Sequence, residues 1–326
     1  MIDFRSYLLM YVDRFKVWAR TFRGGLTLVC LAGLMLFPLT GREYWTQVLV
    51  TAMILTIFAA SWDLLAGFAG QVSFGHAAFF GISGYFAAAM VKFAGFHWLV
   101  ALFVGGGWAV VFSLLIGIPC LRLRGPYLAL GTLAFALILW NLFLSGTWLG
   151  GTEGISGLPS SGDIFTAFYI VAAFMIGSLV IMRTIVDSRL GTILKAIRDD
   201  ETCADASGIN TTTYKLIAFM VSGFFAGISG ALFVLDNTAV NPAVFQSLYS
   251  FYAIIMAAIG GMATIYGSIV GAFLFVILSE LLRPLAAAAL LAFATILILI
   301  VRFAEHGVMD PFLDRVHDVW DMVRRR

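Results

Sequence analysis

Charged residues are scarce in this sequence: Asp, Glu, Lys and Arg make up 12% of 326 residues, whereas apolar residues make up 61%. A water-soluble domain carries about 25% charged residues, because its surface must be solvated. So few charges exclude a large water-exposed surface and indicate a chain surrounded by lipid. In lipid, only helices and closed barrels satisfy every backbone hydrogen bond internally. Because the apolar runs are long and do not alternate, the sequence predicts an all-α polytopic membrane bundle.

Cysteine is scarce as well, and the motifs of common enzymes are missing. Cys30, Cys120 and Cys203 lie in separate segments without metal-ligand spacing, so we expect inert thiols rather than a disulfide or a metal site. The histidines are scattered, and no phosphate-binding lysine loop or hydrolase motif occurs. We therefore predict no catalytic residue, metal or cofactor and, with a net charge of +2, no nucleic-acid partner. A membrane enzyme or scaffold is kept as an alternative.

The apolar runs divide into ten candidate membrane spans of about 20 residues, the length needed to cross roughly 30 Å. They cover approximately residues 25–41, 44–67, 73–91, 98–121, 126–145, 164–184, 215–235, 248–264, 266–282 and 285–301. The first, eighth, ninth and last are short, so we expect tilted, broken or re-entrant segments among them. Merging of the short pair after Tyr249 is the alternative to ten crossings. Lys and Arg set the orientation of such a chain. With both termini inside, 17 of the 20 lie on the inner side, and Arg42, Lys92 and Arg283 lie outside. This split favours cytoplasmic termini.

Residues 25–302 form the predicted transmembrane domain, and the segments around it differ in composition. Residues 1–24 place apolar and basic side chains on opposite helical faces, which predicts a helix lying along the inner leaflet. Residues 303–326 mix acidic and basic groups and predict a solvated cytoplasmic tail. Two longer connections stand out: a Gly- and Ser-rich outer loop, 145–163, and a polar inner loop, 185–214.

The inner loop 185–214 carries the clearest local signals. Asp199 or Asp200 can accept the free N–H groups at the start of a short helix, and Gly208 suits the left-handed position that follows its end. Asn210 or Thr211 can then cap the next membrane helix. The loop therefore predicts a short, capped helix outside the inner face, with an ordinary solvated loop as the alternative.

Residues 67–84 combine five glycines with polar side chains. Small residues let helices approach closely, and polar groups at membrane depth usually face a bundle interior. We therefore regard Gln71, Ser73 and His76 as candidates for lining a transport pathway, beside or within a broken helix. Tight helix packing with hydrogen bonds is the alternative explanation.

Two glycine pairs and an acid near the end of a span are further features of the membrane segments. Gly223 with Gly227, and Gly267 with Gly271, have the GxxxG spacing of close helix packing. Glu280 precedes Arg283 by three residues, which predicts an ion pair near the outer interface.

Asp63 falls near the inner end of its span, within expected reach of water or of Arg122 and Arg124. A secondary, ion-coupled transporter would keep an acid at the membrane midplane. Neither Asp63 nor Glu280 is predicted there, so this class is an alternative and not the favoured one.

Five stretches, in order, resemble LivM-type permeases, the branched-chain amino acid branch of ABC importers. They are residues 67–78 (GFAGQVSFGHAA), 121–134 (LRLRGPYLALGTLA), 150–159 (GGTEGISGLP), 188–233 (beginning SRLGTILKAIRDDE) and 260–272 (GGMATIYGSIVGA). The resemblance covers about residues 45–300. The chain departs from it at Asp63, where the family usually has an amide, near Ser268, where it usually has proline, and after Arg302, where an Arg-Pro-x-Gly pattern is replaced.

The resemblance implies a multi-pass permease subunit of the bacterial inner membrane that is not itself an enzyme. Its partners would be two ABC ATPase subunits, a second LivH-type permease and a periplasmic solute-binding protein. Its solute would be a branched-chain amino acid or a similar small molecule, with urea or short amides as alternatives. The helix of the inner loop would couple to the ATPase. The residues assigned to this coupling are Arg198, Asp199, Asp200, Glu201, Ala204 and Gly208.

Overall fold

The computed structural model describes residues 32–285 except 124, 160 and 161, together with residues 295 and 298. The predicted interfacial helix 1–24 and tail 303–326 lie outside the described residues. So do most of the candidate span 285–301 and the first part of the span 25–41.

Seven described helices are long and apolar enough to cross a membrane. They are α3 (Glu43–Asp63) with its π-helical continuation η2 (Leu64–Phe68), α4 (His76–Ala94), α5 (Trp98–Cys120), α6 (Pro126–Ser145), α7 (Ile164–Asp187), α10 (Thr211–Asn237) and α12 (Ile265–Leu282). An eighth apolar helix, α11 (Ser247–Gly260), has 14 residues and extends about 21 Å, less than the hydrocarbon core. The all-α polytopic prediction is confirmed.

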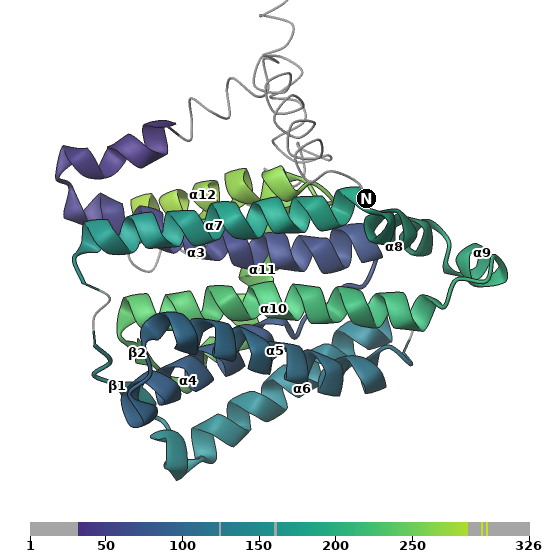
Figure 1. Cartoon of the computed structure of the whole chain (residues 1–326), viewed down its shortest axis with the longest axis horizontal. Coiled ribbons are helices and arrows are strands. Elements are labelled where there is room, and N and C mark those ends of the chain that lie inside the picture. The colour runs from purple at the N-terminus through teal and green to yellow at the C-terminus, as the bar shows by residue number, and fades with distance from the viewer. Residues whose placement is uncertain (1–31, 124, 160–161, 286–294, 296–297, 299–326) are drawn as a thin grey trace, which may run out of the picture.

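The helices run roughly side by side, with α3 and α10 at the centre (Figure 1). On one side α3 packs against α7 and α12, and on the other α10 packs against α4 and α5. In the most apolar 18-residue stretch of each helix, 89% of the stretch is buried in α3 with η2 and 72% in α10, but only 33% in α6 and in α7. Peripheral helices therefore keep apolar faces for lipid or for a partner protein.

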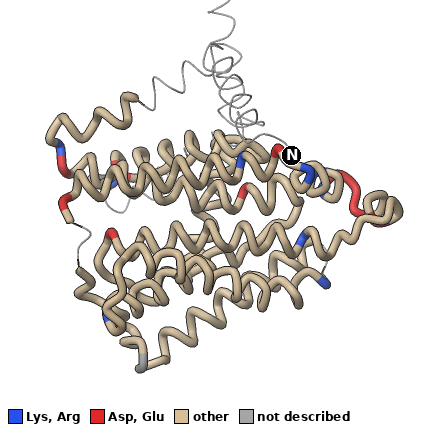
Figure 2. The backbone as a smooth tube through the Cα atoms, viewed as in Figure 1, with Lys and Arg blue, Asp and Glu red and all other residues tan. Residues whose placement is uncertain are grey.

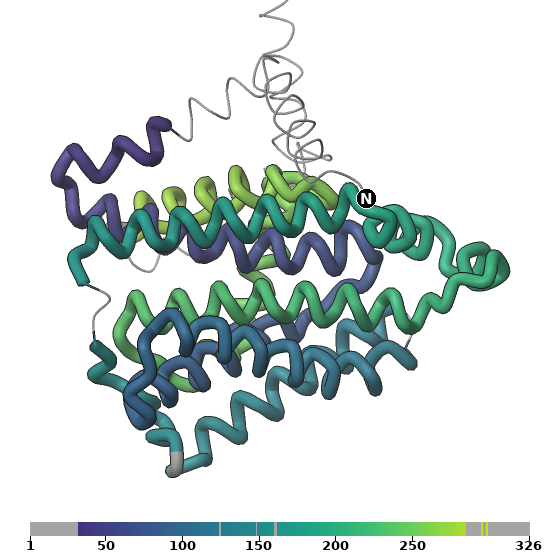
Figure 3. The backbone as a smooth tube through the Cα atoms, in the orientation of Figure 1, coloured from purple at the N-terminus to yellow at the C-terminus, as the bar shows by residue number. Residues whose placement is uncertain are grey.

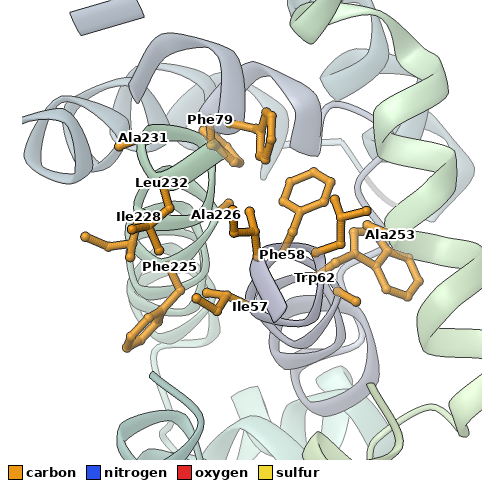
Figure 4. Close-up of a cluster of buried hydrophobic side chains, with 14 of the residues drawn as sticks. Ile57, Phe58, Trp62, Phe79, Phe225, Ala226, Ile228, Ala231, Leu232 and Ala253 are labelled. Carbon is orange, nitrogen blue, oxygen red and sulfur yellow. The ribbon is translucent and has the colours of Figure 1, made fainter. Parts of the chain in front are cut away.

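Large apolar side chains and glycines fill the space between the central helices. Ile57 of α3 lies on the side of Phe225 of α10, whereas Trp62 of α3 lies on the side of Ala253 of α11 (Figure 4). Aromatic and branched side chains of this size exclude water from the interface between the helices.

The GxxxG glycines mark close helix contacts, as predicted. A Cβ at Gly227 would lie 2.6 Å from Ala109 Cβ, and one at Gly223 would lie 2.8 Å from Ser113 Cβ. On α12, a Cβ at Gly267 or Gly271 would meet the backbone of α11.

The two ends of the bundle differ. At one end, the short helices α8 (Arg189–Asp199) and α9 (Glu201–Ala206) project from the bundle (Figure 3); we call it the α8–α9 end. At the other, β1 (Ile155–Ser156) pairs antiparallel with β2 (Ala239–Val240), and we call it the ribbon end. The remaining elements are the 3-10 turns η1 (Phe37–Thr40), η3 (Thr147–Leu149), η4 (Pro242–Phe245) and η5 (Arg283–Leu285).

Basic residues gather at the α8–α9 end (Figure 2). By the helix bounds, the described cations at this end are Arg122, Arg183, Arg189, Lys195, Arg198 and Lys215, against Arg42, Lys92 and Arg283 at the ribbon end. This asymmetry is the basis for assigning an orientation below.

Candidate functional site

The inner loop forms the short capped helix that its sequence predicts. One side-chain oxygen of Asp200 accepts hydrogen bonds from the backbone N–H groups of Thr202 (2.8 Å) and Cys203 (3.0 Å). The hydrogen bond from the Cys203 backbone, above all, holds the pKa of Asp200 below its ordinary value. Asp200 is therefore the N-cap of α9, and Asp199 is the last residue of α8.

The end of α9 is fixed as firmly as its start. Gly208 adopts a left-handed conformation with φ of +84°, where residues with a side chain are strained. The N–H of Ile209 donates to the carbonyl of Ala204 at 3.2 Å, which closes the helix. Asn210 then caps α10 by accepting from the N–H of Thr213 at 3.1 Å. The loop thus leaves little freedom for α9 to tilt relative to α10.

An ion pair joins α9 directly to α10. Nζ of Lys215 lies 2.5 Å from a carboxylate oxygen of Glu201, and the two side chains are 8% and 42% exposed, respectively. A lysine this buried depends on its counter-charge. Lys215 belongs to the first turns of α10, so the ion pair ties the start of α9 to the start of that membrane helix.

A second connection runs from α8 to α3. Nη1 of Arg198 donates to the carbonyl of Gly67 in η2 at 2.9 Å, and Nε and Nη2 bind the exposed carboxylate of Asp199. Leu194 and Ile197 of α8 are buried, so this amphipathic helix packs its apolar side against the bundle.

The residues assigned to coupling differ in exposure. Arg198, Asp199, Asp200 and Gly208 are exposed, Glu201 is half-buried, and Ala204 is buried beneath α9. The structure brings all six together at the α8–α9 end; their role in coupling is taken up below.

Asp63 has different partners from those expected. Its side chain is fully buried, and one oxygen accepts from the N–H of Ala263, in the turn between α11 and α12, at 2.7 Å. The basic group that acts on it electrostatically is Arg198 and not Arg122, and Arg124 lies outside the described residues. The expected contact with water is wrong, because the side chain is fully buried. The partners are far away in the sequence, which is why spacing along one span missed them.

The polar segment after η2 is non-helical from Gly70 to Gly75. The carbonyl of Ser73 accepts from Trp62 Nε1 at 2.8 Å, and the N–H of Phe74 donates to Thr132 Oγ1 at 3.1 Å. These bonds hold an irregular stretch between α3 and α6. The helix is broken here, as one of the two sequence interpretations requires.

The three pathway candidates differ in exposure. His76 is fully buried, with Nε2 3.0 Å from Ser61 Oγ and 3.5 Å from Ser222 Oγ. Ser73 is fully buried too, whereas Gln71 is half-exposed. In this chain, therefore, Ser73 and His76 take part in packing between helices, and Gln71 alone of the three reaches the surface. Lining of a pathway stays a prediction.

The ribbon end is held by polar contacts. Glu280 pairs with Arg283 at 3.1 Å, as predicted, and accepts a hydrogen bond from the Tyr44 hydroxyl. Sequence reasoning missed a bond between α3 and α10, in which Gln47 Nε2 donates to Asp236 at 2.7 Å. These contacts lie close to the ribbon, and together they fix the relative positions of α3, α10 and α12 at this end.

No group of three or more His, Cys, Asp or Glu side chains suited to a metal ion occurs among the described residues.

Comparison with known proteins places these features in context. The family model described as "Branched-chain amino acid transport system / permease component" matches residues 44–303. The high-affinity branched-chain amino acid transport system permease protein LivM of Escherichia coli (strain K12) is 26% identical, over 93% of this chain and 78% of that protein. The nucleoside ABC transporter permease protein NupC of Lactococcus lactis is 24% identical, over 48% of this chain and 56% of its own. The solved structure of PsaBC from Streptococcus pneumoniae in complex with Fab covers 86% of this chain and 98% of that one, with 15% identity and a TM-score of 0.47.

Proposed function

Because the chain belongs to the permease component family of branched-chain amino acid transport systems, we propose that it forms half of the membrane pathway of an ATP-driven importer. Members of this family are membrane subunits and not themselves enzymes. In the proposed transporter, ATP is hydrolysed by two partner ATPase subunits. A periplasmic binding protein delivers the solute, and a second, LivH-type permease completes the pathway in the bacterial inner membrane.

The observation that carries this proposal is the rigid helix α9 outside the bundle. A primary transporter needs a surface through which an external ATPase can move the membrane helices. α9 is capped at both ends, exposed on its outer side and tied by Glu201 to Lys215 of α10. Displacing it would therefore displace α10, which lies at the centre of the bundle.

The charge distribution supports a cytoplasmic α8–α9 end. Cytoplasmic connections of membrane proteins carry an excess of Lys and Arg, and this end holds twice as many described cations as the ribbon end. The ribbon end, with residues 145–163 and 236–247, would then face the binding protein. Both chain termini are proposed to be cytoplasmic, with ten spans in total.

An exposed stretch of irregular backbone supports a partner on one face. Val72 is 42% exposed, and neither its N–H nor its carbonyl has a hydrogen-bond partner among the described residues. The carbonyl of neighbouring Ser73 accepts a hydrogen bond from Trp62. Trp62 lies about 9 Å from Phe68 along the helix axis, so the irregular stretch turns back into the bundle. Irregular backbone at membrane depth is tolerated where protein or a water-filled cavity covers it. This face, which includes Gln71, fits the second permease and the pathway between the two subunits.

The proposed solute is a branched-chain amino acid or a similar small molecule. The relative with the longest match among those described above transports branched-chain amino acids by its name, and the other permease relative transports nucleosides. Uptake competition in the presence of the native binding protein, with Leu, Ile, Val, urea and short amides as competitors, decides the solute class.

The exposed thiol of Cys203 on α9 offers a direct test. In a Cys30→Ser/Cys120→Ser variant, a membrane-impermeant maleimide should label Cys203 in inside-out vesicles, and bound ATPase subunits should block labelling. Glu153→Cys, in the same background, introduces an exposed thiol at the ribbon end and should be labelled in intact spheroplasts. Labelling of Cys203 from the periplasmic side, or labelling unaffected by the ATPase, would contradict the proposal.

A further inference from the structure

A buried carboxylate lies where α3 meets the turn between α11 and α12. Asp63 exposes no surface, and its Oδ1 accepts from the N–H of Ala263 at 2.7 Å. Ala263 has φ of +60°, in the left-handed region that residues with a side chain rarely adopt. The hydrogen bond from this residue therefore holds the turn in a conformation that local sequence preference disfavours.

Gly67 brings the third partner into the same group. A Cβ on Gly67 would meet Oδ1 of Asp63 and would lie 2.6 Å from the nitrogen of Ala263, so the contact requires a residue without a side chain. Gly67 belongs to the π-helical turn η2, a geometry that is rare and frequent at functional sites. Its carbonyl accepts from Nη1 of Arg198. We call Asp63, Gly67, Ala263 and Arg198 the α3 junction.

The α3 junction also contains opposite charges, those of Asp63 and Arg198. The second oxygen of Asp63, Oδ2, has no hydrogen-bond partner among the described residues, and the positive charge that acts on the carboxylate is that of Arg198. Arg198 is itself 35% exposed and binds Asp199 on the surface of the loop. Arg198 therefore contacts an exposed acid of the loop directly, and it reaches the neighbourhood of the buried Asp63 through the carbonyl of Gly67.

We propose that Asp63 is a positioning residue that joins the α8–α9 loop to α3 and to the α11–α12 turn, so that these elements move as one unit during transport. The inference rests on the proposed function, because it concerns how motion of α9 reaches the pathway. The ion pair of Lys215 with Glu201 carries that motion to α10; the α3 junction carries it to α3 and α12. Contiguous packing and hydrogen-bond contacts can carry energetic coupling between distant elements, and the junction supplies such a set.

The test uses the whole transporter, reconstituted in proteoliposomes with its ATPase, second permease and binding protein, and measures solute imported per ATP hydrolysed. Asp63→Ala removes the acceptor of the Ala263 N–H and should lower this ratio about fivefold or more, with hydrolysis continuing. Asp63→Asn keeps an acceptor oxygen and should retain most of the ratio. Asp187→Ala is the matched control, since this acid at the same end is exposed and pairs with Arg183 inside α7; it should leave the ratio unchanged.

Arg198→Gln keeps the test decisive if Asp63→Ala fails to fold, because Arg198 is partly exposed and its loss creates no cavity in the core. It should lower the ratio as Asp63→Ala does, and the double variant should be no worse than the more severe single variant. A wild-type ratio in Asp63→Ala or Arg198→Gln, or losses that multiply in the double variant, would overturn the inference. If the wild-type complex imports no solute with ATP, the proposed function itself is wrong.

Discussion

The close approach of α10 to α5 at Gly227 leads to a quantitative prediction for Gly227→Ala. A Cβ there would lie 2.6 Å from Ala109 Cβ and 3.2 Å from Gly106 Cα and Ser83 Cβ. None of these atoms is the end of a flexible side chain, so the helices must separate by about 0.8 Å to reach ordinary contact near 3.4 Å. Overpacking of this kind costs about 1–3 kcal/mol, and contact with both α5 and α4 places Gly227→Ala near the upper value.

The matched control is Gly107→Ala, on the facing helix α5, where a Cβ would meet nothing within 4 Å. This change should be neutral, or stabilising by up to about 1 kcal/mol, since alanine has the higher helix propensity. Reversible unfolding in mixed micelles, followed by circular dichroism, measures both free energies of unfolding. If the two variants differ by less than about 0.5 kcal/mol, which is the usual error of additivity, the packing argument fails.

Two further predictions concern α9. Glu201→Lys places two positive charges together at Lys215. Gly208→Pro is incompatible with φ of +84° and removes the N–H that donates to the carbonyl of Asp205. Both variants should insert normally but hydrolyse ATP without transport, and wild-type uptake in both would contradict the coupling role. The hydrogen bond from the backbone N–H of Cys203, above all, lowers the pKa of Asp200, so the cap should stabilise α9 at neutral pH and be lost as the pH falls below about 4. Hydrogen-exchange protection of the Cys203 amide, corrected for intrinsic rates, should fall in that range and be low at every pH in Asp200→Ala; protection that is independent of pH would refute the cap.

Much of this arrangement could be predicted from local sequence. Hydrophobic runs gave the positions of the long helices, because length and composition alone decide whether a helix can cross a bilayer. The ends of α9 were predictable too, since Asp200 and Gly208 act on neighbours within a few residues. The GxxxG glycines predicted close contacts for the same reason, although their partner helices could not be named.

Contacts between distant segments were not predictable. Asp63 and Ala263 are 200 positions apart, and Arg198 and Gly67 are 131 apart, so neither bond leaves a periodic signal. The same holds for the pairing of β1 with β2 and for the bond between Gln47 and Asp236. The full burial of His76 also depends on three helices that meet only after folding, which is why a polar residue in a glycine-rich segment fitted both a pathway and a packing role.

The most direct test of the central claim is solute uptake by the reconstituted complex. Uptake should require ATP, the ATPase pair and the binding protein, and it should persist when ionophores collapse the proton and sodium gradients. Uptake that a proton gradient drives in the absence of ATP would contradict the account.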